Sequence, residues 1–136
     1  MKLIQKDLAD LDQKILLLRL DLNVPIKNEK IQDFNRIDKT LPTIKFLLKK
    51  KAKIILISHV GRPMGKKDSK FSLKPISKSL SNKLSENIRL IEENIFKIKK
   101  INIFKKNEKI VMLENIRFYK EEEQNDLVFS KKLASL

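Results

Sequence analysis

The sequence contains no cysteine and a single histidine, His59, among its 136 residues. These scarcities exclude a disulfide framework, a cysteine nucleophile, a thiolate metal site and an imidazole cluster for zinc. Glycine and proline are also scarce, with 2 and 4 residues, while 41% of the residues are hydrophobic and 35% are charged. That composition excludes collagen, low-complexity linkers and most kinds of intrinsic disorder. The length and composition therefore predict one globular domain with one core.

Long apolar runs are missing as well. Runs such as Ile15–Leu18 and Ile54–Ile57 are far shorter than the roughly 20 residues that a membrane-spanning helix needs. The first ten residues carry charges at short intervals and contain no apolar signal region. We therefore expect a cytoplasmic protein with no signal peptide and no membrane partner.

Acidic residues are fewer than basic ones. The 31 Lys and Arg residues against 17 Asp and Glu give a net charge of +14, which suggests a polyanionic partner. Most of these cations are lysines spread along the whole chain, without the interleaved aromatic residues that a single-strand binding surface requires. We interpret them as solvated surface and expect no nucleic-acid partner. A non-catalytic basic module that binds small anions or nucleic acid stays open as an alternative.

Hydrophobic patterning predicts strands that alternate with helices. Short continuous apolar runs are typical of buried parallel strands, and apolar residues at helical spacing predict amphipathic helices. Strands are expected at 14–20, 53–58, 87–91 and 108–113, and helices at 36–50, 72–86 and from 126 onward. Segment 94–103 fits neither pattern. This alternation predicts an α/β fold: an open parallel sheet with helices on both faces, in a Rossmann-like three-layer arrangement.

Three local features of the predicted helices follow from residue type. Asn35 or Asp33 is expected to cap the first helix, and Pro42 is expected to kink it. Ser72 is expected to cap the second helix.

Polar residues follow three of the predicted strands, where an open parallel sheet binds its ligands. Arginine can hold phosphate or carboxylate oxygens with two N–H groups at once, so arginines in these turns favour a small anion. Taken singly, each arginine is more often a surface ion pair, Arg19 can simply pair with Asp21, and His59 is more often structural. Their joint placement predicts an anion site that includes Asp21, Asn23, Arg36, His59, Arg62, Glu114, Asn115 and Arg117.

Other motifs do not support a competing chemistry. Residues 61–66 (GRPMGK) are one residue short of a phosphate-binding loop, and Lys67 occupies the place of its Ser or Thr. The sequence has no Ser-His-Asp order, dinucleotide fingerprint or carboxylate cluster with metal spacing. The acidic run 121–123 is interpreted as a solvated loop or a first helical turn.

Four ordered segments resemble the phosphoglycerate kinase family. They are 19–25 (RLDLNVP), 41–48 (LPTIKFLL), 58–63 (SHVGRP) and 113–123 (LENIRFYKEEE), with further agreement at 71–75 and 131–136. Nearly the whole chain resembles the N-terminal domain of that family. The resemblance implies a monomer and an incomplete N-terminal domain of a two-domain kinase.

The resemblance also implies an activity: reversible phosphoryl transfer between 1,3-bisphosphoglycerate and ADP, giving 3-phosphoglycerate and ATP in glycolysis. Phosphoryl transfer depends on positioning and charge neutralisation more than on a general base. By resemblance, Arg36 is the catalytic residue beside the transferring group. The implied substrate-binding residues are Asp21 and Asn23 at the hydroxyl and carboxyl end of the substrate, and His59, Arg62 and Arg117 at its phosphate. The resemblance places no metal site in this chain.

Some residues depart from the family pattern. Leu22 replaces the usual Phe, Asn35 a common Thr, and Lys51 the Gly that usually ends the first helix. A lysine in a left-handed cap costs about 1 kcal/mol. The last helical pattern stops at Leu136 without a cap. We therefore expect residues 1–136 to be a partial domain that is inactive alone, with the MgATP/MgADP site in a C-terminal domain outside this chain.

Overall fold

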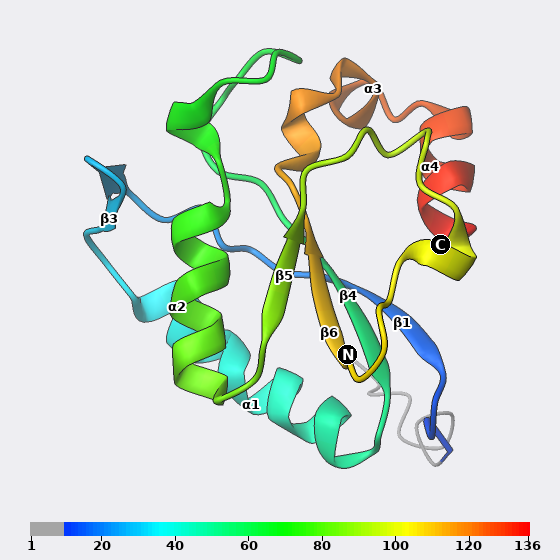
Figure 1. Cartoon of the computed structure of the whole chain (residues 1–136). Helices are drawn as coiled ribbons and strands as arrows, with labels where there is room; N and C mark the ends of the chain where they lie inside the picture. The colour runs from blue at the N-terminus through cyan, green and yellow to red at the C-terminus, as the bar shows by residue number, and fades with distance from the viewer. Residues whose placement is uncertain (1–9) are drawn as a thin grey trace, which may run out of the picture.

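Four parallel strands form the central sheet of the computed structural model, which describes residues 10–136 (Figure 1). In spatial order they are β1 (Ile15–Arg19), β4 (Lys53–Ile57), β6 (Ile110–Leu113) and β5 (Ile88–Ile91). All three pairings are parallel, so the four carboxyl ends lie at one edge of the sheet. The strand predictions are confirmed. The prediction about a signal peptide concerns residues that lie mostly outside the described part.

The sheet is buried on both faces, which explains the continuous apolar runs. In β4, Ile54 and Leu56 belong to one apolar cluster, while Ile55 and Ile57 belong to the other. Successive side chains of a strand point to opposite faces, so the two clusters lie on opposite sides of the sheet. A strand that serves two cores needs apolar residues at every position, not at alternate ones.

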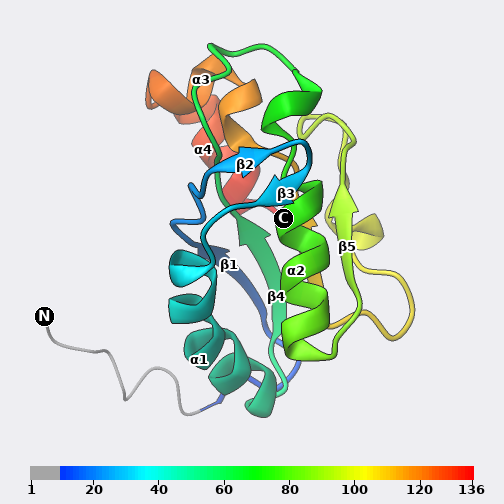
Figure 2. The same ribbon diagram turned by 90° about the vertical axis from the view of Figure 1, so that its left-hand side faces the viewer.

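Helices cover both faces, as expected for three layers (Figures 1 and 2). Helices α1 (Asn35–Lys49) and α2 (Lys74–Leu84) lie on one face, and α1 contributes Ile37, Ile44 and Leu47 to the core. Segment 92–105 and α4 (Leu127–Ala134) cover the other face, with Phe129 of α4 buried against it. The predicted α/β three-layer fold is confirmed.

The helix starts differ from the predictions. Phe34 precedes α1 and makes no side-chain cap bond, while the carboxylate of Asp33 accepts the N–H of Asn35 at 2.9 Å. Leu73, not Ser72, precedes α2, although the Ser72 hydroxyl accepts the N–H of Lys74 at 3.2 Å. Asp33 and Ser72 therefore form local turns just before each helix, and the predicted caps are wrong.

Several short elements were not predicted. A two-stranded hairpin, β2 (Ile26–Lys27) and β3 (Lys30–Ile31), lies between β1 and α1. Two-residue strands show no alternation, so the pattern cannot reveal them. Also not predicted are the 3-10 helices Ser69–Phe71, Lys100–Asn102 and Ile116–Phe118. Helix α3 (Lys120–Glu123) contains the acidic run 121–123, for which a first helical turn was one of the two interpretations. Within residues 10–136, no helix combines the length and apolarity that crossing a membrane demands.

Candidate functional site

The segments that follow β1, β4 and β6 meet at the carboxyl edge of the sheet, and Ser58 joins them. The Ser58 hydroxyl donates to the carbonyl of Leu20 at 2.8 Å and accepts the N–H of Leu22 at 3.2 Å. The carbonyl of Ser58 accepts the N–H of Ile116 at 3.2 Å. Ser58 is fully buried. This serine therefore fixes the loop that carries Asp21 relative to the other two strand ends, a role that the sequence analysis did not assign to it.

Gly61 is contacted from both sides. Its N–H donates to the side-chain oxygen of Asn23 at 2.9 Å, and its carbonyl accepts from Nη1 of Arg117 at 3.5 Å. The φ of Gly61 is +63°, and an added Cβ would lie 2.4 Å from the ring of Phe71. Only glycine fits this position without rearrangement. The loop after β4 is thereby held between Asn23 and Arg117.

Glu114 and Asn115 serve the scaffold and do not face the open edge. The buried Glu114 carboxylate accepts the Ser72 hydroxyl at 2.7 Å and the N–H of Leu73 at 2.8 Å. The buried Asn115 amide donates to the carbonyl of Val60 at 2.8 Å. These polar residues satisfy the turns around the site, as buried polar groups generally do.

Asp21 forms an ion pair with Arg36 at the solvent edge. The hydrogen bond from Arg36 lowers the pKa of Asp21 below 3.8, helped by the N–H of Asn23. The suggested pairing of Arg19 with Asp21 is wrong, because Nη2 of Arg19 donates to Glu122 at 2.7 Å instead. Asp21 is thus a charged carboxylate at neutral pH.

Glu122, in helix α3, lies between two arginines. Its Oε1 accepts from Arg19, and its Oε2 is 3.5 Å from Nε of Arg117. The Glu122 side chain is 9% exposed. The interpretation of the acidic run as a helical turn is confirmed, but a solvated loop is wrong for this residue.

The arginines gather at this edge of the sheet. Four of the five, all except Arg89, lie at the strand exits or at the start of α1.

His59 is half-buried beside these charges. Burial lowers the pKa of His59 below 6.5, and the charges of Arg117 and Arg19 lower it further, while Glu122 and Asp21 act in the opposite direction. The imidazole is therefore neutral at pH 7. A neutral imidazole still donates one N–H, which an anion can accept.

Arg62 extends the loop after Gly61 and is exposed. Among residues 10–136, its side chain makes no ion pair. The resemblance implies six residues for catalysis and substrate binding, and the structure links five of them through direct contacts or close charge interactions: Asp21, Asn23, Arg36, His59 and Arg117. Arg62 lies in the same loop without touching another member of the set.

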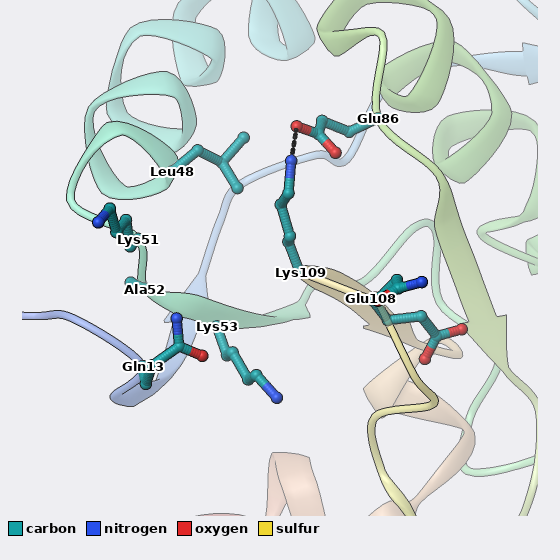
Figure 3. Close-up of a pocket in the computed structure, with 9 residues that line it drawn as sticks. Gln13, Leu48, Lys51, Ala52, Lys53, Glu86, Glu108 and Lys109 are labelled. Carbon is teal, nitrogen blue, oxygen red and sulfur yellow. Dashed lines mark hydrogen bonds and ion pairs between the residues drawn. The ribbon is translucent and has the colours of Figure 1, made fainter.

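A hollow of about 540 Å³ lies elsewhere, at the amino-terminal ends of β4 and β6 (Figure 3). Its carboxylates are already paired: Glu86 with Lys109 at 2.8 Å, and Glu108 with Arg89 at 2.7 Å. Within the described chain, no group of three His, Cys, Asp or Glu side chains is placed to hold a metal ion. The residues that line this hollow include no arginine, whereas Arg19, Arg36, Arg62 and Arg117 gather at the carboxyl edge.

A parallel α/β sheet whose carboxyl edge gathers arginines, a neutral histidine and a charged aspartate is typical of domains that bind small anionic ligands. Within that class, the chain belongs to the phosphoglycerate kinase family, whose family model matches residues 6–136. This assignment confirms the family that the four sequence segments resemble.

The chain is similar to curated phosphoglycerate kinases over nearly all of its length. It is 47% identical over 129 residues to the enzyme of the Wolbachia of Brugia malayi, which covers 94% of this chain and 32% of the relative. It is 48% identical over 129 residues to that of Dictyoglomus turgidum, with 93% and 32% covered. The chain thus spans about a third of the length of these relatives.

Solved structures show the same similarity. The phosphoglycerate kinase structure from Coxiella burnetii superposes with a TM-score of 0.82 at 36% identity, covering 94% of this chain and 32% of that one. The structure from Pyrococcus horikoshii OT3 gives a TM-score of 0.77 at 31% identity, covering 98% and 34%.

Proposed function

We propose that this chain is the phosphoglycerate-binding part of a phosphoglycerate kinase, a phosphotransferase with a carboxyl group as acceptor. The enzyme would transfer a phosphoryl group reversibly from 1,3-bisphosphoglycerate to ADP, giving 3-phosphoglycerate and ATP. The observation that carries the proposal is the Gly61 loop, which Asn23 and Arg117 hold from two sides. That arrangement brings residues from three strand exits together at one edge of the sheet.

The proposed roles follow from the charge and exposure of each residue. Arg62 and Arg117 would hold the phosphate of the substrate, since a guanidinium binds two phosphate oxygens at once, and neutral His59 would donate a hydrogen bond to it. Asn23, together with Asp21, would bind the hydroxyl and carboxyl end.

Arg36 would act as the catalytic residue and neutralise charge on the transferring phosphoryl group. In the structure its guanidinium is paired with Asp21, and both side chains are more than half exposed. An exposed ion pair contributes little to stability, so Arg36 can turn from Asp21 to a more highly charged phosphoryl group at small cost.

The nucleotide would bind outside residues 1–136. Among the described residues, no three His, Cys, Asp or Glu side chains are grouped so that they could hold a metal ion. We propose that residues 1–136 are part of an N-terminal phosphoglycerate domain of a monomeric cytoplasmic enzyme, and that a C-terminal domain binds MgATP or MgADP. The coverage of about a third of each relative supports this division.

Calorimetric titration of the purified chain with 3-phosphoglycerate tests the proposed site. Arg62→Ala and Arg117→Ala are each expected to weaken binding about tenfold or more, because each loses a charge-assisted hydrogen bond. Lys97→Ala, an exposed cation on the segment after β5, is the control and should leave binding unchanged.

The alternative, a basic module for nucleic acid, predicts a different result. DNA would bind with an affinity that falls steeply with salt and is indifferent to the two arginine substitutions. That result, together with no response to 3-phosphoglycerate, would contradict the proposed function.

A further inference from the structure

Glu122 is the best-buried carboxylate that touches the arginines of the candidate site. Its side chain is 9% exposed, against 57% for Arg19 and 25% for Arg117. It belongs to α3, about one hundred residues after Arg19, so its contact with that arginine joins the end of β1 to α3. Burying a charged carboxylate to this extent costs free energy, because the carboxylate loses its hydration, unless nearby charged partners compensate for that loss.

The two contacts of Glu122 differ in kind. Oε1 accepts a short hydrogen bond of 2.7 Å from Arg19. Oε2 faces Nε of Arg117 at 3.5 Å, and both of these buried atoms lack a hydrogen-bond partner in the described chain. The hydrogen bond from Arg19 fixes the position of the carboxylate. The second contact attracts the Arg117 guanidinium by charge but does not use its N–H groups in a hydrogen bond. Nη1 of Arg117 meanwhile reaches the Gly61 carbonyl at 3.5 Å.

We propose that Glu122 is a positioning residue of the phosphoglycerate site: anchored by Arg19, it directs the guanidinium of Arg117 towards the Gly61 loop and leaves its N–H groups available to an anion. This inference rests on the proposed function for the identity of the anion. Glu122 does not contact the substrate in this scheme and acts through Arg117.

The neighbouring acidic residues supply the comparison. Glu123 is 3.9 Å from Nε of Arg117 but is 45% exposed, which makes its interaction weak. Glu121 makes no ion pair within residues 10–136. Glu121→Gln therefore removes the same charge from the same short helix without touching an arginine, and it is the matched control for Glu122→Gln.

His59 offers a readout that needs no ligand. The charges that shift the pKa of His59 are those of Arg19 from β1, Asp21 after β1, Arg117 after β6 and Glu122 from α3. Because the carboxylate of Glu122 raises the pKa of His59, Glu122→Gln should lower that pKa. His59 is the only histidine of the chain, so its imidazole NMR signal is unambiguous.

The first experiment compares wild type, Glu122→Gln and Glu121→Gln by NMR at several pH values, after circular dichroism has shown that each is folded. The expected result is a lower pKa of His59 and a moved Nε–Hε signal of Arg117 in Glu122→Gln, with both unchanged in Glu121→Gln. Glu122→Asp keeps the negative charge, so its His59 pKa should lie closer to that of the wild type than the pKa in Glu122→Gln does. An Arg117 signal that does not respond to Glu122→Gln would overturn the proposal.

The second experiment is a double-mutant cycle on 3-phosphoglycerate binding with Arg117→Ala. Glu122→Gln should weaken binding about tenfold more when Arg117 is present than when it is absent, the scale of one charge-assisted hydrogen bond. Comparing the two backgrounds removes the general effect of a lost negative charge. Equal effects would overturn the positioning role. Failure of the wild-type chain to bind 3-phosphoglycerate would contradict the proposed function alone, and the NMR comparison would still decide whether Glu122 positions Arg117.

Discussion

At the scale of single residues, the polar groups of the carboxyl edge divide into two sets. Ser58, Glu114 and Asn115 are buried and bind backbone groups, so they shape the loops. Asp21 and Arg36 are exposed and bind each other. Residue type alone does not separate the two sets, because polar residues of both sets follow the predicted strands in the sequence. Burial separates them, and burial depends on the packed structure.

Ser58→Ala tests the first set. The substitution leaves the buried N–H of Leu22 and carbonyl of Leu20 without the Ser58 hydroxyl, and we expect the free energy of unfolding to fall by about 1–3 kcal/mol. Urea denaturation monitored by circular dichroism measures it. The control is Ser130→Ala, which removes an exposed hydroxyl from α4 and should change stability by less than about 0.5 kcal/mol. Equal losses in the two variants would contradict the role given to Ser58.

Glu108→Gln tests the paired carboxylate at the opposite edge of the sheet. Two hydrogen bonds from Arg89, at 2.7 and 2.8 Å, lower the pKa of Glu108 below 4.5. At pH 7 the variant should lose about 1–2 kcal/mol, less than a fully buried pair because Arg89 is partly exposed.

The pH dependence of that loss has a definite sign. A lowered pKa in the folded state stabilises the protein above the unfolded pKa, and this contribution disappears as the pH falls through the folded value. The stability difference between wild type and Glu108→Gln should therefore be full above about pH 5 and shrink below pH 4.5. Urea titrations at pH 7 and pH 3 measure the difference, with exposed Glu93→Gln as the control. A difference that stays constant with pH would refute the assignment.

The sequence predicted five residues of the linked set at the site, but it did not predict Glu122. Asp21, Asn23, His59 and Arg117 were expected there because they follow apolar runs, and Arg36 because it lies at the start of a predicted helix. Glu122 lies 103 residues from Arg19 inside an acidic run with two similar neighbours. No local pattern distinguishes it, because its partners are brought to it by the sheet and not by the chain around it.

At the scale of the secondary-structure elements, the end of α1 is fully explained by its hydrogen bonds. The N–H of Lys51 donates to the carbonyl of Leu48 at 2.9 Å, and that of Ala52 donates to Leu47 at 3.2 Å. This is the Schellman arrangement, which requires a left-handed residue after the helix. Lys51 has a φ of +58°, so the left-handed conformation expected of this lysine is confirmed.

Lys51→Gly should raise the free energy of unfolding by about 1 kcal/mol, because glycine adopts the left-handed conformation without the Cβ penalty. Lys49→Gly, two residues earlier and inside the helix, is the opposite control and should lower stability by about 1 kcal/mol. Thermal unfolding by differential scanning calorimetry compares the two. If Lys51→Gly lowered the free energy of unfolding, the Lys51 side chain would have to stabilise the fold by more than its left-handed conformation costs.

Strand and helix positions were predictable because long apolar patterns persist over many residues. The helix caps were not predictable from the sequence. Asp33 and Ser72 do accept a backbone N–H, but each lies two residues before the first residue of its helix and not at the capping position. The strand order β1-β4-β6-β5 could not be predicted from the sequence either, because nothing in the apolar runs indicates that β6 lies between β4 and β5.

At the scale of the whole molecule, the comparisons place this chain as about a third of its relatives. Phosphoryl transfer needs both substrates in line and water excluded by closure around them. We therefore expect the purified 136-residue chain to show no measurable ATP formation from 1,3-bisphosphoglycerate and MgADP. A coupled spectrophotometric assay measures it, with a complete phosphoglycerate kinase as positive control. ATP formation by this chain would contradict the proposed division of the two sites.

Both glycines of the chain, Gly61 and Gly65, lie in the single loop that borders the candidate site, each with a positive φ. An added Cβ at Gly65 would lie 2.9 Å from Cβ of Lys120, so neither position tolerates a side chain easily. Other left-handed turns of the described chain use Asn28, Ser85 or Asn107 instead. In this glycine-poor chain, both glycines therefore mark places where the backbone passes too close to a neighbouring residue to carry a side chain.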